Sequence, residues 1–206
     1  MPNKINKLQR IIGNGLVLFS CEGVAEGVIV TKLIEHDLTF LDRAQIVQDD
    51  SADEDETDVH WFTNERHERR IEDAFLNEDY GNDVFVLSVK DQQKHGLKFR
   101  ETYTTRLHPV HAINIITHPE IEMLVLYREG QDQQFRKWYE RNKRSLGKNA
   151  KPSKFCTTEL RMADVKEYSF LKPYWDDETE LVGALNAYRQ HTVNEPGDFM
   201  LADLLK

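Results

Sequence analysis

Residues 16–23 are LVLFSCEG, and this stretch decides the fold that the sequence predicts. Four consecutive apolar residues follow Gly15, and a glutamate-glycine pair ends the stretch, as expected for a strand buried on both faces of a parallel sheet. Such a strand, over residues 16–20, brings Glu22 to the carboxyl end of the sheet. Ligands of open α/β sheets bind at that edge. Glu22 is therefore the first candidate functional residue.

Strand and helix patterns alternate on both sides of this stretch. Further strands are predicted at residues 44–47, 83–89 and 112–116. Helices are predicted at residues 4–12, 25–36, 64–77, 99–107, 120–127, 131–146, 154–164, 178–191 and 201–205. This alternation indicates an α/β fold with a mostly parallel sheet flanked by helices. We expect one domain over residues 1–206, with a core at about 15–127 and a helical C-terminal region at about 128–206.

The composition excludes several classes of protein. Hydrophobic residues make up 39% and charged residues 31% of the 206 residues, and no apolar run approaches the roughly 20 residues of a membrane-spanning helix. The N-terminus lacks the pattern of a secretory signal, and the two cysteines are too few for a disulfide scaffold. We therefore expect a soluble, cytoplasmic protein with free thiols and no membrane partner. The net charge of −9 opposes non-specific adhesion to nucleic acid over the whole surface.

Three further acidic residues follow predicted strands. Asp91 comes after the strand at 83–89, and Glu120 and Glu122 come after the strand at 112–116, where a helix begins. Together with Glu22, these carboxylates would be hard oxygen ligands for Mg²⁺, which can stabilise charge during phosphodiester hydrolysis. Simpler interpretations stay open. The helix dipole favours acidic residues in a first turn, Asp91 can organise a turn with its own side chain, and Glu122 can face solvent.

The same residues carry a resemblance to a known family. Residues 18–26, LFSCEGVAE, resemble the opening strand and glutamate-glycine turn of Toprim domains, in particular the RloB-like and OLD-type groups. The strand that leads to Asp91 resembles the second Toprim motif. Residues 117–124, THPEIEML, resemble the proline-glutamate pattern that begins a later helix in the RloB-like group. The resemblance covers roughly residues 16–126.

The resemblance implies a Toprim-type α/β fold, magnesium-dependent action on phosphodiester bonds and a role in bacterial defence against foreign DNA. Glu22 would act as a general acid, a general base or a metal ligand, Asp91 as a metal ligand, and Glu122 as an assisting ligand. The chain departs from the family at the second motif, because Toprim enzymes commonly carry Asp-x-Asp there and this chain has Asp91-Gln92-Gln93. A neutral amide in place of the second carboxylate would weaken metal binding.

This departure keeps two other hypotheses open. In one, the domain is a non-catalytic, Toprim-like interaction or sensing module that recruits a protein partner. In the other, the motifs are accidental, which predicts that Glu22, Asp91 and Glu122 lie apart in the fold. No phosphate-binding loop, dinucleotide fingerprint or Gly-x-Ser-x-Gly motif occurs in the sequence. We assign no zinc to the histidines at 108 and 111, and we expect the acidic tract at 49–58 to be an exposed loop.

Basic residues are concentrated between residues 136 and 154, where Trp138 and Tyr139 lie among them. Lysine and arginine bind phosphates and aromatic rings stack on bases, so this stretch is a candidate nucleic-acid contact surface. The alternative is an exposed basic helix that Trp138 anchors to the core. The candidate contact residues are Arg136, Lys137, Arg141, Lys143, Arg144 and Lys148, and Lys151 and Lys154 follow them.

Overall fold

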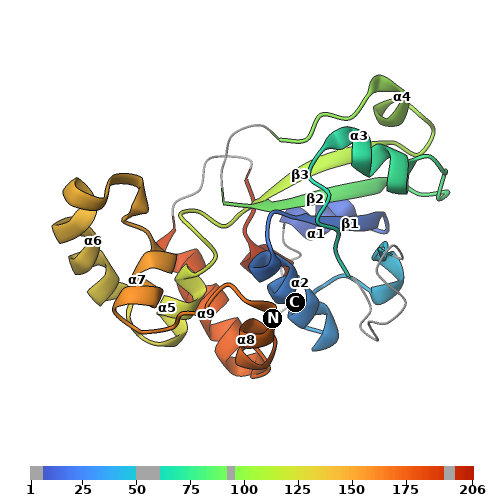
Figure 1. The fold of residues 1–206 in the computed structure, drawn as a ribbon. Coiled ribbons are helices and arrows are strands. Elements are labelled where there is room, and N and C mark those ends of the chain that lie inside the picture. Colours follow the sequence, from blue (N-terminus) through green and yellow to red (C-terminus); the bar gives the residue numbers. More distant parts are fainter. Residues whose placement is uncertain (1–6, 50–60, 92–95, 193–197) are drawn as a thin grey trace.

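The computed structural model describes residues 7–49, 61–91, 96–192 and 198–206, and they form a mixed α/β fold (Figure 1). A three-stranded parallel sheet has the order β1-β2-β3, with β1 (Leu16–Cys21), β2 (Val84–Lys90) and β3 (Val110–Ile116). Leu16 lies opposite Val84, and Val84 lies opposite Val110. The strands predicted at 16–20, 83–89 and 112–116 are confirmed.

The strand predicted at 44–47 is wrong. Residues Arg43–Gln45 form a 3₁₀ turn, and only Ile46 makes an isolated bridge to Val17 of β1. The side chain of Gln45 explains the difference, because its amide nitrogen donates to the carbonyl oxygens of Gly13 and Gly15, each at 3.0 Å. These bonds hold the segment as a turn at the start of β1.

The helices surround the sheet and extend past it. Those before β3 are α1 (Lys7–Ile12), α2 (Val24–Glu35), α3 (Glu68–Ile71), which continues as a π-helical turn over Glu72–Leu76, and α4 (Glu101–Thr104). Those after β3 are α5 (Met123–Arg128), α6 (Asp132–Leu146), α7 (Pro152–Thr158), α8 (Tyr168–Tyr174) and α9 (Glu178–His191). Short 3₁₀ turns lie at Gly147–Asn149 and Leu201–Leu204. The predicted helix at 178–191 is confirmed, whereas α8 was not predicted.

Two hydrophobic clusters cover the two faces of the sheet. Successive residues of β1 point to opposite faces, so Val17 and Phe19 join the larger cluster and Leu18 joins the smaller one. The larger cluster includes residues of α2, α5 and α9, and the smaller one includes Ile71 and Leu76. Burial on both faces explains why β1 and β2 have continuous apolar sequences.

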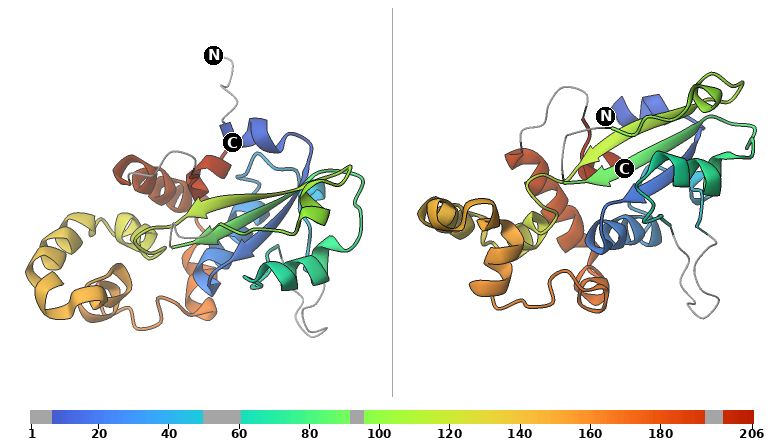
Figure 2. Two further views of the ribbon diagram at one scale, coloured as in Figure 1. Left: turned by 90° about the horizontal axis from the view of Figure 1, so that it is seen from above. Right: turned by 45° about the horizontal axis from the view of Figure 1, so that its top comes forward.

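Helix α2 follows β1 directly and packs on the sheet although Gly27 interrupts its apolar pattern. A Cβ atom at Gly27 would overlap the ring of Phe62, so this glycine permits the close approach of Phe62 to the helix. The strand arrows point toward the side of the molecule where α5 to α9 gather (Figure 2). The carboxyl ends of the strands therefore face the C-terminal helices.

Among the described helices, none has the length and apolar character that a membrane crossing requires. Both cysteines, Cys21 and Cys156, are buried free thiols, as the sequence predicts.

Candidate active site

The carboxyl ends of the three strands open into one cavity of about 380 Å³. Acidic side chains reach it from the segment after each strand. Three basic side chains, of Arg66, Lys151 and Lys166, line it as well. The acidic residues that line it are Glu22, Glu26, Asp91, Glu120 and Glu122. The accidental-motif hypothesis predicts that Glu22, Asp91 and Glu122 lie apart, and the structure instead places all three in this cavity.

Glu22 and Asp91 are held together by the backbone at the ends of β1 and β2. The backbone N–H of Glu22 donates to the carbonyl oxygen of Val89 at 2.9 Å, which extends the strand pairing by one residue. The backbone N–H of Asp91 in turn donates to Oε2 of Glu22 at 3.1 Å. The pairing of two parallel strands therefore fixes both carboxylates side by side.

The surroundings of Asp91 disfavour its negative charge. Burial raises the pKa of Asp91, and the adjacent charge of Glu22 and the contact between the two side chains raise it further. The Oδ1 atom of Asp91 is buried and has no hydrogen-bond partner among the residues that the structure describes. A buried oxygen without a donor is uncommon in native proteins, and it points to a partner that a ligand would supply.

Glu26 is a further acidic residue of the cavity that the sequence did not single out. It lies in the first turn of α2, it is only 7% exposed, and a Cβ atom at Gly23 would lie 2.9 Å from its Oε2 atom. Gly23 thus leaves room for the carboxyl group of Glu26. Burial raises the pKa of Glu26 to about 7, and the charges of Glu122, Glu22 and Asp91 add to that effect. The spacing of four residues from Glu22, with glycine after Glu22, is the signal that could have identified it.

The negative charge of Glu120 is already paired within the protein. Its Oε1 atom accepts from Nζ of Lys151 at 2.6 Å, and its Oε2 atom accepts from the backbone N–H of Ser153 at 3.0 Å. Burial by itself would raise the pKa of Glu120, but these two donors outweigh it and keep the pKa below its ordinary value. Glu120 therefore clamps the start of α7 to the end of β3.

Glu122 faces the cavity and not solvent, so the solvent-facing alternative is wrong. It is 3% exposed and pairs with Nζ of Lys166 at 3.2 Å, and the same Nζ lies 3.8 Å from Glu120. Burial raises the pKa of Glu122, and Lys166 partly offsets this effect. Lys166 comes from the irregular segment between α7 and α8, where no sequence pattern marks it.

The donor set fits Mg²⁺ in an open site. Within the described ranges, no group of three or more histidine, cysteine or acidic side chains is arranged to hold a metal by itself. Mg²⁺ commonly keeps several waters and binds through one or two carboxylates and the phosphates of a substrate. Glu22 and Asp91 supply two such carboxylates, and Oδ1 of Asp91 accepts no hydrogen bond from the described part of the chain. Gln92 and Gln93, the rest of the second motif, lie outside the described residues.

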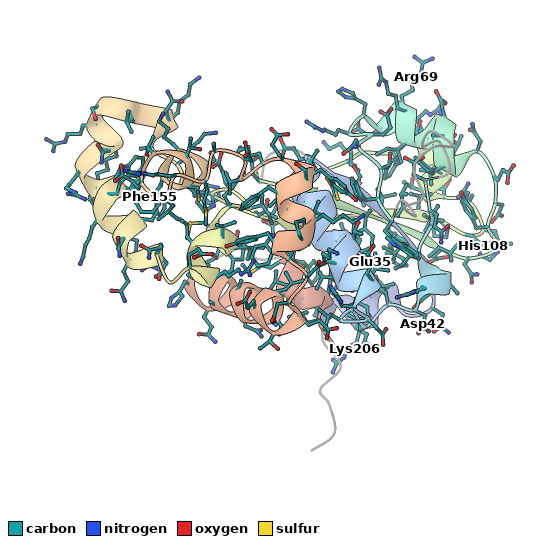
Figure 3. The ribbon with its side chains drawn as sticks, turned by 60° about the horizontal axis from the view of Figure 1, so that its bottom comes forward. Glu35, Asp42, Arg69, His108, Phe155 and Lys206 are labelled. Carbon is teal, nitrogen blue, oxygen red and sulfur yellow. The ribbon has the colours of Figure 1, made fainter. Side chains whose placement is uncertain are left out.

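The candidate nucleic-acid contact residues lie on α6 and in the 3₁₀ turn that follows it, and all six are exposed. Trp138 is 6% exposed, packs against Phe155, and donates from Nε1 to Glu159 at 3.0 Å. The anchoring role of Trp138 is therefore confirmed. Side chains of α6 extend outward at one end of the molecule, with Phe155 on the inner side of the helix (Figure 3). Anchored this way, α6 still presents its basic side chains outward.

Comparison with known proteins identifies no relative, since no family model, no curated protein and no solved structure matches the chain. The Toprim resemblance remains a prediction from the motifs.

Proposed function

We propose that this protein is a Toprim-like, magnesium-dependent phosphodiesterase that acts on nucleic acid, with Glu22 and Asp91 as the core of its site and Glu122 as an assisting group. One observation carries the proposal. Carboxylates that follow all three strands line a single cavity, and one of them, Asp91, has a buried oxygen for which the described residues supply no hydrogen-bond donor. A divalent cation is the ligand that best satisfies such an oxygen.

The residues of the cavity have separable roles in this proposal. Glu22 and Asp91 would hold Mg²⁺, which when bound would supply Lewis acidity at a phosphoryl oxygen. Lys151 and Lys166 place positive charge beside the position of a substrate phosphate. In the absence of a metal ion, Glu26 has a pKa of about 7, so both of its protonation states are populated near neutral pH. It can therefore hold or release a proton at the leaving oxygen.

A cleavage assay tests the proposal. Wild-type protein is incubated with single-stranded and duplex DNA and RNA in Mg²⁺ or in EDTA, and the rate of chain cleavage is measured. We expect cleavage only in Mg²⁺, with a loss of about 100-fold or more in Glu22→Gln and in Asp91→Asn. Glu101→Gln, which changes an exposed glutamate of α4, is the matched control and should cleave at the wild-type rate. Equal activity in wild type and Glu22→Gln would remove Glu22 from the mechanism.

A second candidate function is a non-catalytic interaction or sensing module. The observation in its favour is that no three histidine, cysteine or acidic side chains among the described residues are arranged so that they could hold a metal ion. Calorimetric titration with Mg²⁺ separates the two functions. A saturable site at millimolar Mg²⁺ that disappears in Asp91→Asn supports the phosphodiesterase, and the lack of any saturable site supports the module.

A further inference from the structure

A second cavity adjoins the acidic one and differs from it in chemistry. It has a volume of about 550 Å³, which lies within the range of small-molecule sites. Asp91, Glu120 and Lys151 line both cavities, so the two share a wall. Beyond that wall the lining is apolar and aromatic, with a basic rim. The residues that supply it are His118, Pro119, Phe135, Tyr139, Lys148 and Ala150.

Two aromatic residues of α6 form one side of this second cavity. Phe135 is 7% exposed and is held by Trp138 and Phe155, so its ring is a fixed part of the wall. Tyr139 is 39% exposed, and its ring centroid lies 6.1 Å from that of Phe135. An exposed ring on a fixed support offers a face on which a planar group can stack.

The rim of the second cavity carries basic side chains that could hold a phosphate, although Asp91 and Glu120 line the same cavity. Lys148 is exposed at its rim, and Lys151 reaches from it toward Glu120. Lys143 lies over the ring of Tyr139, with Nζ 5.8 Å from the centroid. A basic rim beside an exposed aromatic ring is the combination by which proteins hold unpaired nucleotides, with the phosphates on lysine and the base on the ring.

We infer that this second cavity is a nucleoside subsite, which takes the unpaired base of a single-stranded nucleic acid whose neighbouring phosphate lies in the acidic cavity. The inference rests on the proposed function for the position of that phosphate. Stacking on Tyr139 needs an exposed base face, so the ligand is single-stranded at this position. Because Asp91, Glu120 and Lys151 line both cavities, a base in the second cavity and a phosphate in the acidic one would be neighbours along a strand.

Binding without turnover tests the inference. Fluorescence anisotropy measures the affinity of a labelled ten-nucleotide single strand and of the matching duplex, both in EDTA, for wild type and variants. We expect the single strand to bind more tightly than the duplex. We expect Tyr139→Ala to weaken single-strand binding about 5- to 100-fold, because one stacked base is lost. Tyr139→Phe keeps the ring and should bind like wild type.

Two controls separate stacking from folding and from simple charge attraction. Tyr168→Ala removes a tyrosine of α8 that is 44% exposed and does not line the cavity, and it should leave binding unchanged. Lys148→Gln should weaken binding to every sequence. The slope of log K against the logarithm of the salt concentration should fall by about one, the value for one lost phosphate contact. Because Tyr139 is only 39% exposed and packs on Phe135, the thermal unfolding midpoint of Tyr139→Ala is measured as well, and binding is compared below that midpoint.

Several outcomes would overturn the inference. These are equal affinity for single strand and duplex, wild-type affinity in Tyr139→Ala, or no binding of any oligonucleotide. The outcome for the proposed function is separate, because cleavage is measured in Mg²⁺ and binding in EDTA. Binding that depends on Tyr139 without any cleavage supports the subsite and contradicts the phosphodiesterase. Cleavage that is unaffected by Tyr139→Ala supports the phosphodiesterase and contradicts the subsite.

Discussion

Asp91 and Glu120 reach the same cavity from the ends of neighbouring strands, but their surroundings move their pKa values in opposite directions. Lys151 and the backbone of Ser153 donate to Glu120, and its pKa is lowered against the effect of burial. Burial and the charge of Glu22 raise the pKa of Asp91. The cavity thus has a lysine-paired half, formed by Glu120, Glu122, Lys151 and Lys166, and a carboxyl-rich half, formed by Glu22, Glu26 and Asp91.

The difference between the halves shows where a cation would bind most favourably. In the lysine-paired half, folding has already brought positive charge to the carboxylates. In the carboxyl-rich half, folding brings three carboxyl groups close together. Burial first, and the charges of the neighbouring carboxylates second, raise the pKa values of Glu26 and Asp91. A divalent ion would be the largest local charge there and would relieve that repulsion. The predictions below test this contrast.

The largest effect is expected from Glu26→Gln. The folded-state pKa of Glu26, about 7, lies above its ordinary value of 4.5, so folding favours the protonated form. Its contribution to stability is intact below pH 4.5 and is lost as the pH rises through 7. Glutamine is neutral at every pH. The free energy of unfolding of Glu26→Gln should therefore exceed that of wild type by up to about 3 kcal/mol at pH 8 and equal it at pH 4.

Urea unfolding in EDTA at the two pH values measures this difference. Glu101→Gln, on the exposed surface of α4, should show no pH-dependent offset from wild type. If the difference in unfolding free energy between Glu26→Gln and wild type is the same at pH 4 and pH 8, the pKa of Glu26 is not raised by folding.

The next prediction compares one residue from each half. Glu120→Gln removes the charged partner of Lys151 and should lower the free energy of unfolding by about 2 kcal/mol. Asp91→Asn removes a carboxylate from beside Glu22 and should raise the free energy of unfolding by less than about 1 kcal/mol, because solvent screens part of the side chain. Urea unfolding at pH 7.5 in EDTA checks both. Changes of the same sign would contradict the division into two halves.

Magnesium should stabilise the protein through the carboxyl-rich half. At ten times its dissociation constant, an ion that binds only the folded state adds about 1.4 kcal/mol to the free energy of unfolding. For a chain of this size, that is a rise of roughly 3–6 °C in Tm. Thermal unfolding with and without Mg²⁺ should show this rise in wild type and in Glu120→Gln. If Mg²⁺ raises the Tm of Asp91→Asn as much as that of wild type, the ion binds outside the carboxyl-rich half.

The sequence predicted the parts of the site that follow from parallel pairing. Apolar runs identified β1, β2 and β3, and the shared direction of these strands is what brings Glu22, Asp91 and Glu122 to one edge. No local pattern could show that the side chain of Gln45 turns residues 43–45 toward Gly13 and Gly15. A strand propensity was overridden there by a tertiary hydrogen bond.

The ion pairs in the cavity were harder to predict from the sequence than the strands were. Lys166 lies in an irregular segment more than forty residues beyond Glu122, and only the packing of the C-terminal helices brings the two together. Glu26 lies within the motif that carries the family resemblance, yet its burial depends on Gly23 and on the opposite wall of the cavity. Residue types were predictable, whereas their ion pairs and pKa values depend on the tertiary structure.

The smallest effect is expected from Lys166→Met, which makes the lysine-paired half resemble the other half. The side chain of Lys166 is 53% exposed, so its loss should cost less than about 1 kcal/mol at pH 8. Without Lys166, the pKa of Glu122 should rise further. The loss of unfolding free energy should therefore become smaller at pH 4, where Glu122 is protonated and has no negative charge for Lys166 to pair with. One positive charge fewer should tighten Mg²⁺ binding about 2- to 10-fold in a calorimetric titration. The matched control is Lys154→Met, on the exposed face of α7, which should leave Mg²⁺ binding unchanged. Weaker Mg²⁺ binding in Lys166→Met would show instead that Lys166 supports the metal site and that the two halves act as one.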